Sequence, residues 1–330
     1  MAEKEKLKVG VVGVGALGRH HARLYNMSNK AEVVGVYDVS KKTAQAVGEE
    51  LGLTVFDSPE ELADKCEALS VAVPATKHNE TSVPLLKMNK HLLIEKPIAA
   101  SVKNGREIVE EAAKRNLVLG VGHVERFNPA MDYLEKRAAF TRFVEAHRLS
   151  PYPPARRGQH RRGTEVGVVL DLMIHDIDLI LTMIDCDIER FDAVGIPVLS
   201  KTEDIANVRI KFTNGSVANL TASRVSVEPM RRFRVFQTDC YISMDYAKHS
   251  GLIVKKKKLG IAKKEVNLDE KNALQEELEN FIDCVQETKK TGKVVNPKVS
   301  GSQGQKALEL AVQITEEIND YNKRYGVKFA

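Results

Sequence analysis

The stretch from Lys8 to Asp38 constrains the fold more than any other part of the 330-residue chain. An apolar run, Val9 to Val12, precedes a loop whose residues 13–18 read Gly-Val-Gly-Ala-Leu-Gly, and a second apolar run follows an amphipathic segment. The glycines fit the pattern G-x-G-x-x-G between a predicted strand and a predicted helix, with Asp38 after the next predicted strand. This order is typical of a unit that binds a dinucleotide.

Each position of this loop has a separate role in such a unit. Gly13 makes the tight turn out of the strand, Gly15 lets the backbone approach a pyrophosphate, and Gly18 lets the helix pack on the strand. The predicted helix starts near Ala16. The backbone N–H groups of its first residues, Ala16 and Leu17, and its positive dipole end point at the phosphates. A glycine-rich turn in another kind of α/β protein is the alternative interpretation.

Asp38 predicts which dinucleotide binds. Its carboxylate would accept hydrogen bonds from both hydroxyls of an adenosine ribose and would repel a 2′-phosphate. The sequence therefore favours NAD over NADP as the cofactor. Lys41 and Lys42 weaken this preference, because either side chain could reach round to a phosphate.

The first 124 residues alternate strand and helix patterns, which predicts an α/β domain with a parallel sheet and helices on both faces. Ligands of such sheets bind at the carboxyl ends of the strands. Beyond the glycine loop and Asp38, the predicted cofactor-binding residues at this edge are Pro74, His78, Glu95, Lys96 and His123.

The second half shows strand patterns without intervening helices, and therefore predicts an α+β domain with a large, mostly antiparallel sheet. The strand-like runs are 191–198, 205–212, 216–223, 233–237 and 241–245. Asn214 and Gly215 predict a tight hairpin turn. Helices are predicted over 168–183, 273–288 and 304–321. We place the domain boundary after residue 124, which gives domains 1–124 and 125–330.

Composition excludes several classes of protein. The net charge of +5 is mild, so neither nucleic acid nor a membrane is expected as a partner. The four cysteines are far apart, which argues against a zinc or redox motif. The N-terminus is charged and no apolar run is long enough to span a membrane, so we expect a cytoplasmic protein. The basic run Lys255 to Lys258 is interpreted as a charged sheet edge that resists aggregation.

Lys96 is the first candidate for chemistry. It stands between Glu95 and Pro97, just past a predicted buried strand at the ligand edge of the parallel sheet. Pro97 removes a backbone donor and stiffens the turn, which would fix the direction of the lysine. The position is compatible with a solvated loop charge and with a group held over the nicotinamide.

Asp171 and His175 are the second candidate, because residues four positions apart share a face of a helix. A carboxylate can fix the tautomer and orientation of a histidine, as a general base requires. Asp176 and Asp178 are further polar groups in this otherwise apolar helix, a pattern that favours function over simple burial. A metal site is the competing interpretation, but no cysteine or second histidine lies at ligand spacing, so no metal is expected.

The glycine loop, the motif from Glu95 to Pro97 and the pair Asp171 and His175, in this order, resemble the Gfo/Idh/MocA oxidoreductases. The resemblance spans nearly the whole chain and implies a Rossmann domain followed by an open, mostly antiparallel domain whose sheet often forms an oligomer interface. A homodimer or homotetramer is expected on this ground. The resemblance also implies that Lys96 and His175 flank the carbon that gives up hydride, with Asp171 as a substrate or catalytic partner.

Within that family, residues 122–130 are similar to the UDP-N-acetylglucosamine 3-dehydrogenases, which oxidise the sugar C3 hydroxyl before an aminotransferase acts on the ketone in lipid A or surface polysaccharide biosynthesis. A nucleotide-sugar substrate also suits the arginines near the expected domain junction, since guanidinium groups match a diphosphate. A solvated basic loop between Pro154 and Gly163 is the other interpretation of those arginines. The predicted substrate-binding residues are Lys96, Arg126, Asn128, Arg161, Asp171 and His175.

The resulting hypothesis is the oxidation of a sugar hydroxyl. His175 takes the hydroxyl proton while the carbon gives hydride to NAD, and Lys96 stabilises the charge that develops on the oxygen. One alternative is a dehydrogenase of an inositol, an aldose or another nucleotide sugar. The other is a nucleotide-binding regulator without the chemistry, which would be expected to lack one of Lys96, Asp171 or His175.

Overall fold

The computed structural model describes residues 6–137, 141–154, 164, 166–268 and 271–327. The chain forms two compact units, of which the first comprises Met1–Val124 and Asn272–Leu308. The second comprises Glu125–Lys271 and Glu309–Ala330. The expected second domain, 125–330, differs from the observed unit by the segment Asn272–Leu308, which belongs to the first.

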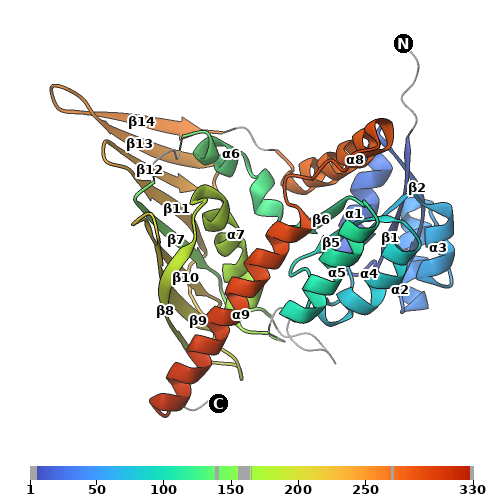
Figure 1. The fold of residues 1–330 in the computed structure, drawn as a ribbon, viewed down its shortest axis with the longest axis horizontal. Coiled ribbons are helices and arrows are strands. Elements are labelled where there is room, and N and C mark those ends of the chain that lie inside the picture. Colours follow the sequence, from blue (N-terminus) through green and yellow to red (C-terminus); the bar gives the residue numbers. More distant parts are fainter. Residues whose placement is uncertain (1–5, 138–140, 155–163, 165, 269–270, 328–330) are drawn as a thin grey trace. The chain divides into compact units, whose positions relative to one another are not determined.

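The first unit contains a six-stranded sheet in the order β3-β2-β1-β4-β5-β6, with all neighbours parallel. The strands are β1 (Leu7–Val12), β2 (Ala31–Tyr37), β3 (Thr54–Val55), β4 (Ala68–Val71), β5 (His91–Glu95) and β6 (Leu119–Gly122). The helices are α1 (Ala16–Met27), α2 (Lys41–Leu51), α3 (Pro59–Lys65), η1 (Ala75–Lys77), α4 (His78–Lys87) and α5 (Val102–Lys114). Helices cover both faces of this sheet, which confirms the predicted doubly covered parallel sheet (Figure 1). The strand order reverses between β1 and β4, where such sheets bind their ligands.

A late segment of the chain completes the first unit. The side chains of Leu278, Phe281 and Ile282, from α8 (Ala273–Thr291), are buried in one cluster with residues of β1 and α1. Further along, the Val121 N–H donates to the carbonyl oxygen of Val299 at 3.1 Å, so the chain pairs with the edge strand β6. These contacts join residues far apart in sequence, which is why the pattern of residues did not reveal them.

The second unit contains an eight-stranded sheet in the order β14-β13-β12-β11-β7-β10-β9-β8. The strands are β7 (Phe143–Leu149), β8 (Ile188–Ile196), β9 (Ile205–Phe212), β10 (Val217–Ser223), β11 (Met230–Phe236), β12 (Cys240–Asp245), β13 (Ser250–Lys256) and β14 (Ile261–Asn267). One neighbouring pair, β7 with β10, is parallel and the others are antiparallel, which confirms the predicted mostly antiparallel sheet. The predicted strands omitted β7, β13 and β14, because charged residues interrupt their apolar patterns.

Helices cover one face of this second sheet: α6 (Pro129–Glu135), α7 (Ile174–Met183) and part of α9 (Gly301–Arg324) (Figure 1). The covered face follows the period of a strand, since Ala206, Val208 and Ile210 of β9 are buried while Asn207 and Arg209 between them are exposed. The described helices include none with the length and apolar character needed to cross a membrane.

Candidate active site

The three glycines of the loop after β1 have different surroundings. Gly13 has a φ angle of 84°, and a Cβ there would lie 2.8 Å from the side chain of Val73. A Cβ at Gly18 would lie 1.8 Å from the carbonyl oxygen of Gly13, so α1 packs directly on the loop. A Cβ at Gly15 would meet nothing within 4 Å. Gly15 also begins α1 without a side-chain cap, so backbone N–H groups and open space coincide there, as an anion site requires.

Asp38 ties this loop to the end of β2. Its Oδ2 accepts a hydrogen bond from the Val14 N–H at 2.8 Å, and its Oδ1 accepts one from the Ser40 N–H at 2.8 Å. Each carboxylate oxygen keeps a second lone pair that a ribose hydroxyl can use. Lys41 makes an ion pair of 2.9 Å with Asp57 on the surface, so its charge has a partner within the protein.

Lys96 follows a buried carboxylate at the end of β5. Glu95 is 8% exposed, its Oε1 lies 3.0 Å from Nε2 of the buried His21, and its Oε2 accepts the Lys96 N–H at 3.2 Å. Burial would raise the pKa of Glu95, but the hydrogen bond with His21 and the charge of Lys96 hold that pKa below its usual value. The backbone at Lys96 is therefore held in place by Glu95, which in turn contacts His21 of α1.

The other predicted cofactor-binding residues lie at the same edge of the sheet. The His78 side chain is 1% exposed, with Nδ1 2.9 Å from the carbonyl oxygen of Pro97 and Nε2 3.0 Å from that of Val73. Burial lowers the pKa of His78, and its ring holds the segments after β4 and β5 together. Pro74 precedes η1 and is exposed, and His123 follows β6 and is buried. The first unit thus brings all the predicted cofactor-binding residues to the carboxyl ends of its strands.

The segment with Asp171 and His175 is not the regular helix that the sequence predicted. Val169–Met173 form a π-helical turn, η3, and α7 continues from Ile174. The start of this turn is held by Glu203, whose backbone oxygen accepts the Val168 N–H at 2.9 Å and whose Oε1 accepts the Val169 N–H at 3.3 Å. Asp171 and His175 are both half-buried. Single π turns inside helices are frequent at functional sites.

An arginine fixes the next part of the helix. Arg148, which is 2% exposed, forks onto Asp176 with Nε 3.1 Å from Oδ2 and Nη2 3.2 Å from Oδ1. Its Nη1 donates to Glu125 at 3.1 Å, and the Tyr246 hydroxyl donates to Asp176 at 3.2 Å. Sequence reasoning missed this network. The available signal was the alternation of β7, which places Arg148 on the buried side with Val144 and Ala146.

Two predicted substrate-binding residues have partners inside the second unit. Arg126 is 4% exposed and forms ion pairs with Asp178 and Glu135 at 3.6 and 3.3 Å. Asn128 is buried and caps α6 by accepting the Ala130 N–H at 3.0 Å. Their side chains thus stabilise α6 and α7, and their contact with substrate stays a prediction. The other predicted arginine, Arg161, and its neighbours Arg156, Arg157, His160 and Arg162 lie outside the described residues.

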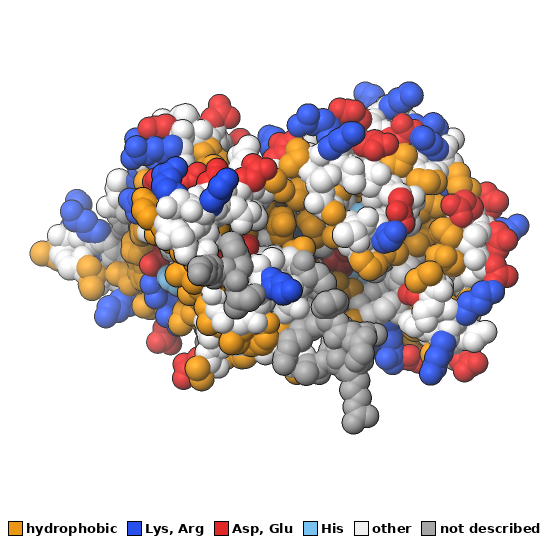
Figure 2. Space-filling model, turned by 90° about the horizontal axis from the view of Figure 1, so that it is seen from below, with side chains coloured by type: hydrophobic (Ala, Val, Ile, Leu, Met, Phe, Trp, Pro, Cys, Tyr) orange, Lys and Arg blue, Asp and Glu red, His pale blue; other side chains and the backbone are white. Residues whose placement is uncertain are grey.

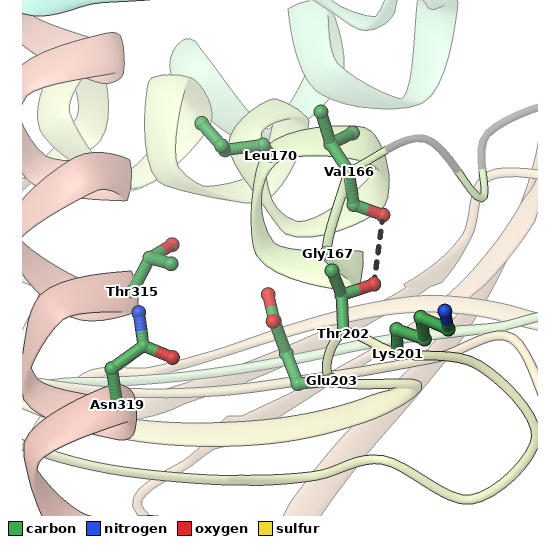
Figure 3. A pocket seen from close by; sticks show the side chains of 8 residues that line it. All are labelled: Val166, Gly167, Leu170, Lys201, Thr202, Glu203, Thr315 and Asn319. Atoms are coloured by element: carbon green, nitrogen blue, oxygen red, sulfur yellow. Dashed lines mark hydrogen bonds between the residues drawn. The ribbon is translucent and has the colours of Figure 1, made fainter. Parts of the chain in front are cut away.

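A cavity of about 410 Å³ lies beside the start of the π turn (Figure 3). It is lined by Val166, Gly167, Leu170, Lys201, Thr202, Glu203, Thr315 and Asn319. The Thr202 hydroxyl donates to the Val166 carbonyl oxygen at 3.3 Å, and burial raises the pKa of Glu203. Neither Asp171 nor His175 lines this cavity. Across the part of the chain that the structure describes, no group of three or more His, Cys, Asp or Glu side chains is placed to hold a metal ion.

A doubly wound parallel sheet with a glycine loop at the start of its first helix, followed by an open antiparallel sheet, is the architecture of a two-domain dinucleotide-binding protein. The chain belongs to the Gfo/Idh/MocA family: residues 7–123 match the "Oxidoreductase family, NAD-binding Rossmann fold" and residues 139–243 match the "GFO/IDH/MocA C-terminal domain". This confirms the family resemblance seen in the sequence. The protein is therefore an NAD(P)-dependent dehydrogenase that acts on CH–OH groups.

The chain is similar along nearly its whole length to enzymes of this family. It is 32% identical over 326 residues to a UDP-N-acetylglucosamine 3-dehydrogenase from Acidithiobacillus ferrooxidans, covering 96% of this chain and 99% of that one. A solved structure of that enzyme matches with a TM-score of 0.88 at 31% identity, over 96% of this chain and 99% of the other. A myo-inositol 2-dehydrogenase from Thermotoga maritima is 24% identical over 329 residues, covering 95% and 97% of the two chains.

Proposed function

We propose that this protein uses NAD to oxidise the C3 hydroxyl of UDP-N-acetylglucosamine to the 3-keto nucleotide sugar. The observation that carries the proposal is that the polar side chains along η3 and α7 differ in burial and in their partners. Asp176 is buried against Arg148 and Asp178 against Arg126, whereas Asp171 and His175 are half-buried. The 32% identity to a UDP-N-acetylglucosamine 3-dehydrogenase supports the choice of substrate.

The preference for NAD follows from the end of β2. NAD, when bound, would take up the hydride from the substrate carbon. The N–H groups at the start of α1 would hold its pyrophosphate, and Asp38 would hold the ribose hydroxyls. A 2′-phosphate would meet the carboxylate of Asp38, while Lys41 is paired with Asp57.

In the proposed reaction His175 accepts the proton of the C3 hydroxyl as the carbon loses hydride. Lys96 stabilises the negative charge that develops on the oxygen, and Asp171 orients the histidine or the substrate. Arg161 and its basic neighbours would contact the diphosphate of the nucleotide. The 3-keto product suits an aminotransferase, in the synthesis of lipid A or a surface polysaccharide.

We expect the enzyme to work as an oligomer in the cytoplasm. A homodimer or homotetramer would form through the eight-stranded sheet of the second unit. A cytoplasmic location fits the cysteines at 66, 186, 240 and 284, all of which are free thiols.

The test is the rise of NADH absorbance after the protein is mixed with NAD and UDP-N-acetylglucosamine. His175→Ala and Lys96→Met should each lower kcat about 10²–10⁴-fold and leave NAD affinity nearly unchanged. His20→Ala and Lys103→Met, which change exposed residues, should keep the wild-type rate. Wild-type turnover by Lys96→Met would remove the lysine from the mechanism.

A second candidate function, the oxidation of an inositol, is favoured by the similarity to myo-inositol 2-dehydrogenase. Free UDP distinguishes the two, because only a nucleotide-sugar enzyme should be inhibited by it competitively. Turnover of myo-inositol that UDP does not inhibit would reject the nucleotide-sugar proposal. NAD binding without turnover of any polyol or sugar would favour a regulator.

A further inference from the structure

The hairpin between β13 and β14 carries a dense basic cluster that the dehydrogenase site does not use. Its strands and turn contribute exposed lysines at positions 255, 256, 257, 258, 263 and 264. The interpretation as a charged sheet edge accounts for the lysines of β14, which is the edge strand. It does not account for the run from Lys255 to Lys258, which lies at the end of β13 and in the turn.

These lysines differ from the other basic side chains of the same sheet. Lys211 is paired with Glu189 at 2.9 Å, and Arg234 with Glu145 at 2.6 Å. None of the hairpin lysines makes such an ion pair with a carboxylate among the described residues. Basic and acidic side chains are interspersed on the face seen in Figure 2. With six lysines and one exposed carboxylate, Glu265, the hairpin is therefore a local concentration of positive charge.

Two large apolar side chains stand at the end of this basic hairpin. Leu259 is 96% exposed and Ile261 is 65% exposed. The turn that presents them is closed by a hydrogen bond of 3.0 Å from the Lys257 N–H to the Gly260 carbonyl oxygen, with Gly260 at a φ angle of 91°. A leucine is not needed for this turn, and its exposure to water is unfavourable.

Strand register places lysines on both sides of the apolar tip. Lys255 lies opposite Ala262, and Lys256 lies opposite Ile261. Because side chains alternate along a strand, Lys255 and Lys264 project from one face of the ribbon, and Lys256 and Lys263 from the other. A partner bound to one face of the ribbon would contact the lysines of that face alone. A surface that the tip of the hairpin enters would contact the lysines of both faces.

We propose that the β13–β14 hairpin docks this protein on an anionic lipid surface. Leu259 and Ile261 enter the boundary between head groups and acyl chains, and the surrounding lysines lie at the level of the phosphates. Apolar insertion and a polybasic cluster are two signals that together give stable but reversible attachment. The hairpin has no aromatic side chain on which a nucleic-acid base could stack. The proposal departs from the sequence expectation of no membrane partner and does not depend on the substrate proposed above.

The test is co-sedimentation of the full-length protein with vesicles of phosphatidylcholine, with or without phosphatidylglycerol. The protein should sediment with the anionic vesicles at low salt, and the bound fraction should fall as salt rises. Leu259→Ser/Ile261→Ser keeps the charges and should weaken vesicle binding about tenfold or more. Lys257→Ser/Lys258→Ser keeps the apolar tip and should weaken it similarly.

Matched controls use the same chemistry elsewhere in the second unit. Val227→Ser removes an apolar side chain that is 94% exposed, and Lys323→Ser/Arg324→Ser removes two exposed charges, so both should bind vesicles as the wild type does. Dehydrogenase activity should be unchanged in all four variants, which shows that they fold. No sedimentation with anionic vesicles at low salt would overturn the proposal. A changed oligomeric state in the Leu259→Ser/Ile261→Ser variant would also overturn it, because the hairpin would then contact a second copy of the protein. The same holds if the wild type and this variant bind polyglutamate equally well, because the lysines would then recognise an acidic protein.

Discussion

At the scale of single residues, the same side-chain type serves different ends within a few positions. Asp176 is 1% exposed and neutralises Arg148, while Asp171, on the preceding π turn, is half-buried. A carboxylate that neutralises a buried arginine cannot be removed without leaving that charge unpaired. The function of a polar residue in this helix therefore depends on what faces it.

Two alanine substitutions separate the roles of the loop glycines. Gly18→Ala should lower the free energy of unfolding by about 1–3 kcal/mol, because its Cβ would collide with the backbone of Gly13. Gly15→Ala should leave the free energy of unfolding nearly unchanged, since its Cβ would meet no protein atom within 4 Å. It should raise the dissociation constant of NAD about tenfold, because this Cβ would occupy the space expected for the pyrophosphate. Chemical denaturation and an NAD titration on both variants measure these effects. Equal loss of stability in the two variants would contradict this assignment.

Asp204 should make the stability of the second unit depend on pH. Burial would raise its pKa, but hydrogen bonds to the carboxylate lower that pKa to about 2. The donors are the N–H groups of Val198, Leu199 and Ser200, the Ser200 hydroxyl and the Arg224 guanidinium. Because the folded pKa lies below the unfolded value of 3.8, this stabilisation is complete above pH 4 and is lost as the pH falls towards 2. The contribution is about 2 kcal/mol.

Asp204→Asn removes this titration. The difference in unfolding free energy between the wild type and Asp204→Asn should be largest near neutral pH and should shrink as the pH falls from 4 to 2. Asp192→Asn, at an exposed position, should show no such convergence. Denaturant titrations at several pH values measure this difference in unfolding free energy. If the difference does not change with pH, the charge of the Asp204 carboxylate is not what stabilises the β8–β9 turn.

At the scale of elements, α7 owes its position to charge as much as to apolar packing. Its buried apolar residues include Ile174, Ile177 and Ile180, yet Asp176 and Asp178 are buried among them. Arg148 on β7 and Arg126 before α6 neutralise these carboxylates. The helix that presents His175 is thereby fixed in rotation as well as in depth.

Arg148→Met should destabilise the protein by about 3–5 kcal/mol, because Asp176 would remain buried without its partner. Adding Asp176→Leu should recover part of this loss, since the unpaired charge is then gone. Arg209→Met, on the exposed side of β9, should change stability little. Urea denaturation measures all three, and a single variant as stable as the wild type would mean that the ion pair is not needed to hold α7.

At the scale of the whole molecule, the chain returns late to complete its first unit. The buried cluster around β1 and α1 includes Leu278, Phe281, Ile282 and Val285 of α8. The dinucleotide-binding unit therefore needs residues from the last third of the chain.

Phe281→Ala should lower the stability of the first unit by about 3–5 kcal/mol, because it empties part of this core. In thermal unfolding it should lower the transition that NAD raises, since a ligand stabilises the unit that binds it. Phe233→Ala, in the core of the second unit, is the matched control and should leave that transition in place. If NAD raises a transition that Phe281→Ala does not move, α8 does not stabilise the dinucleotide-binding unit.

The sequence by itself determined the elements whose causes are local. Examples are the turn at Gly13, the buried strand just before Lys96 and the hairpin turn at Asn214 and Gly215, which follow from residues that are neighbours in the chain. These elements place the glycine loop, Asp38 and Lys96 at one edge of a parallel sheet. The order of the motifs was enough to indicate the family.

Only the tertiary structure decided which polar side chains are held internally. Arg126 and Asn128 are predicted from the sequence to bind substrate, and the structure adds partners inside the second unit, Asp178 for Arg126 and the Tyr246 carbonyl oxygen for Asn128. Arg148 meets Asp176, and Val121 pairs with Val299, across separations that no local pattern encodes. The π turn at Val169–Met173 likewise arises where Glu203 anchors its start and arginines anchor α7. Local sequence fixes backbone conformation, whereas the burial and pairing of charge depend on which distant segments the fold brings together.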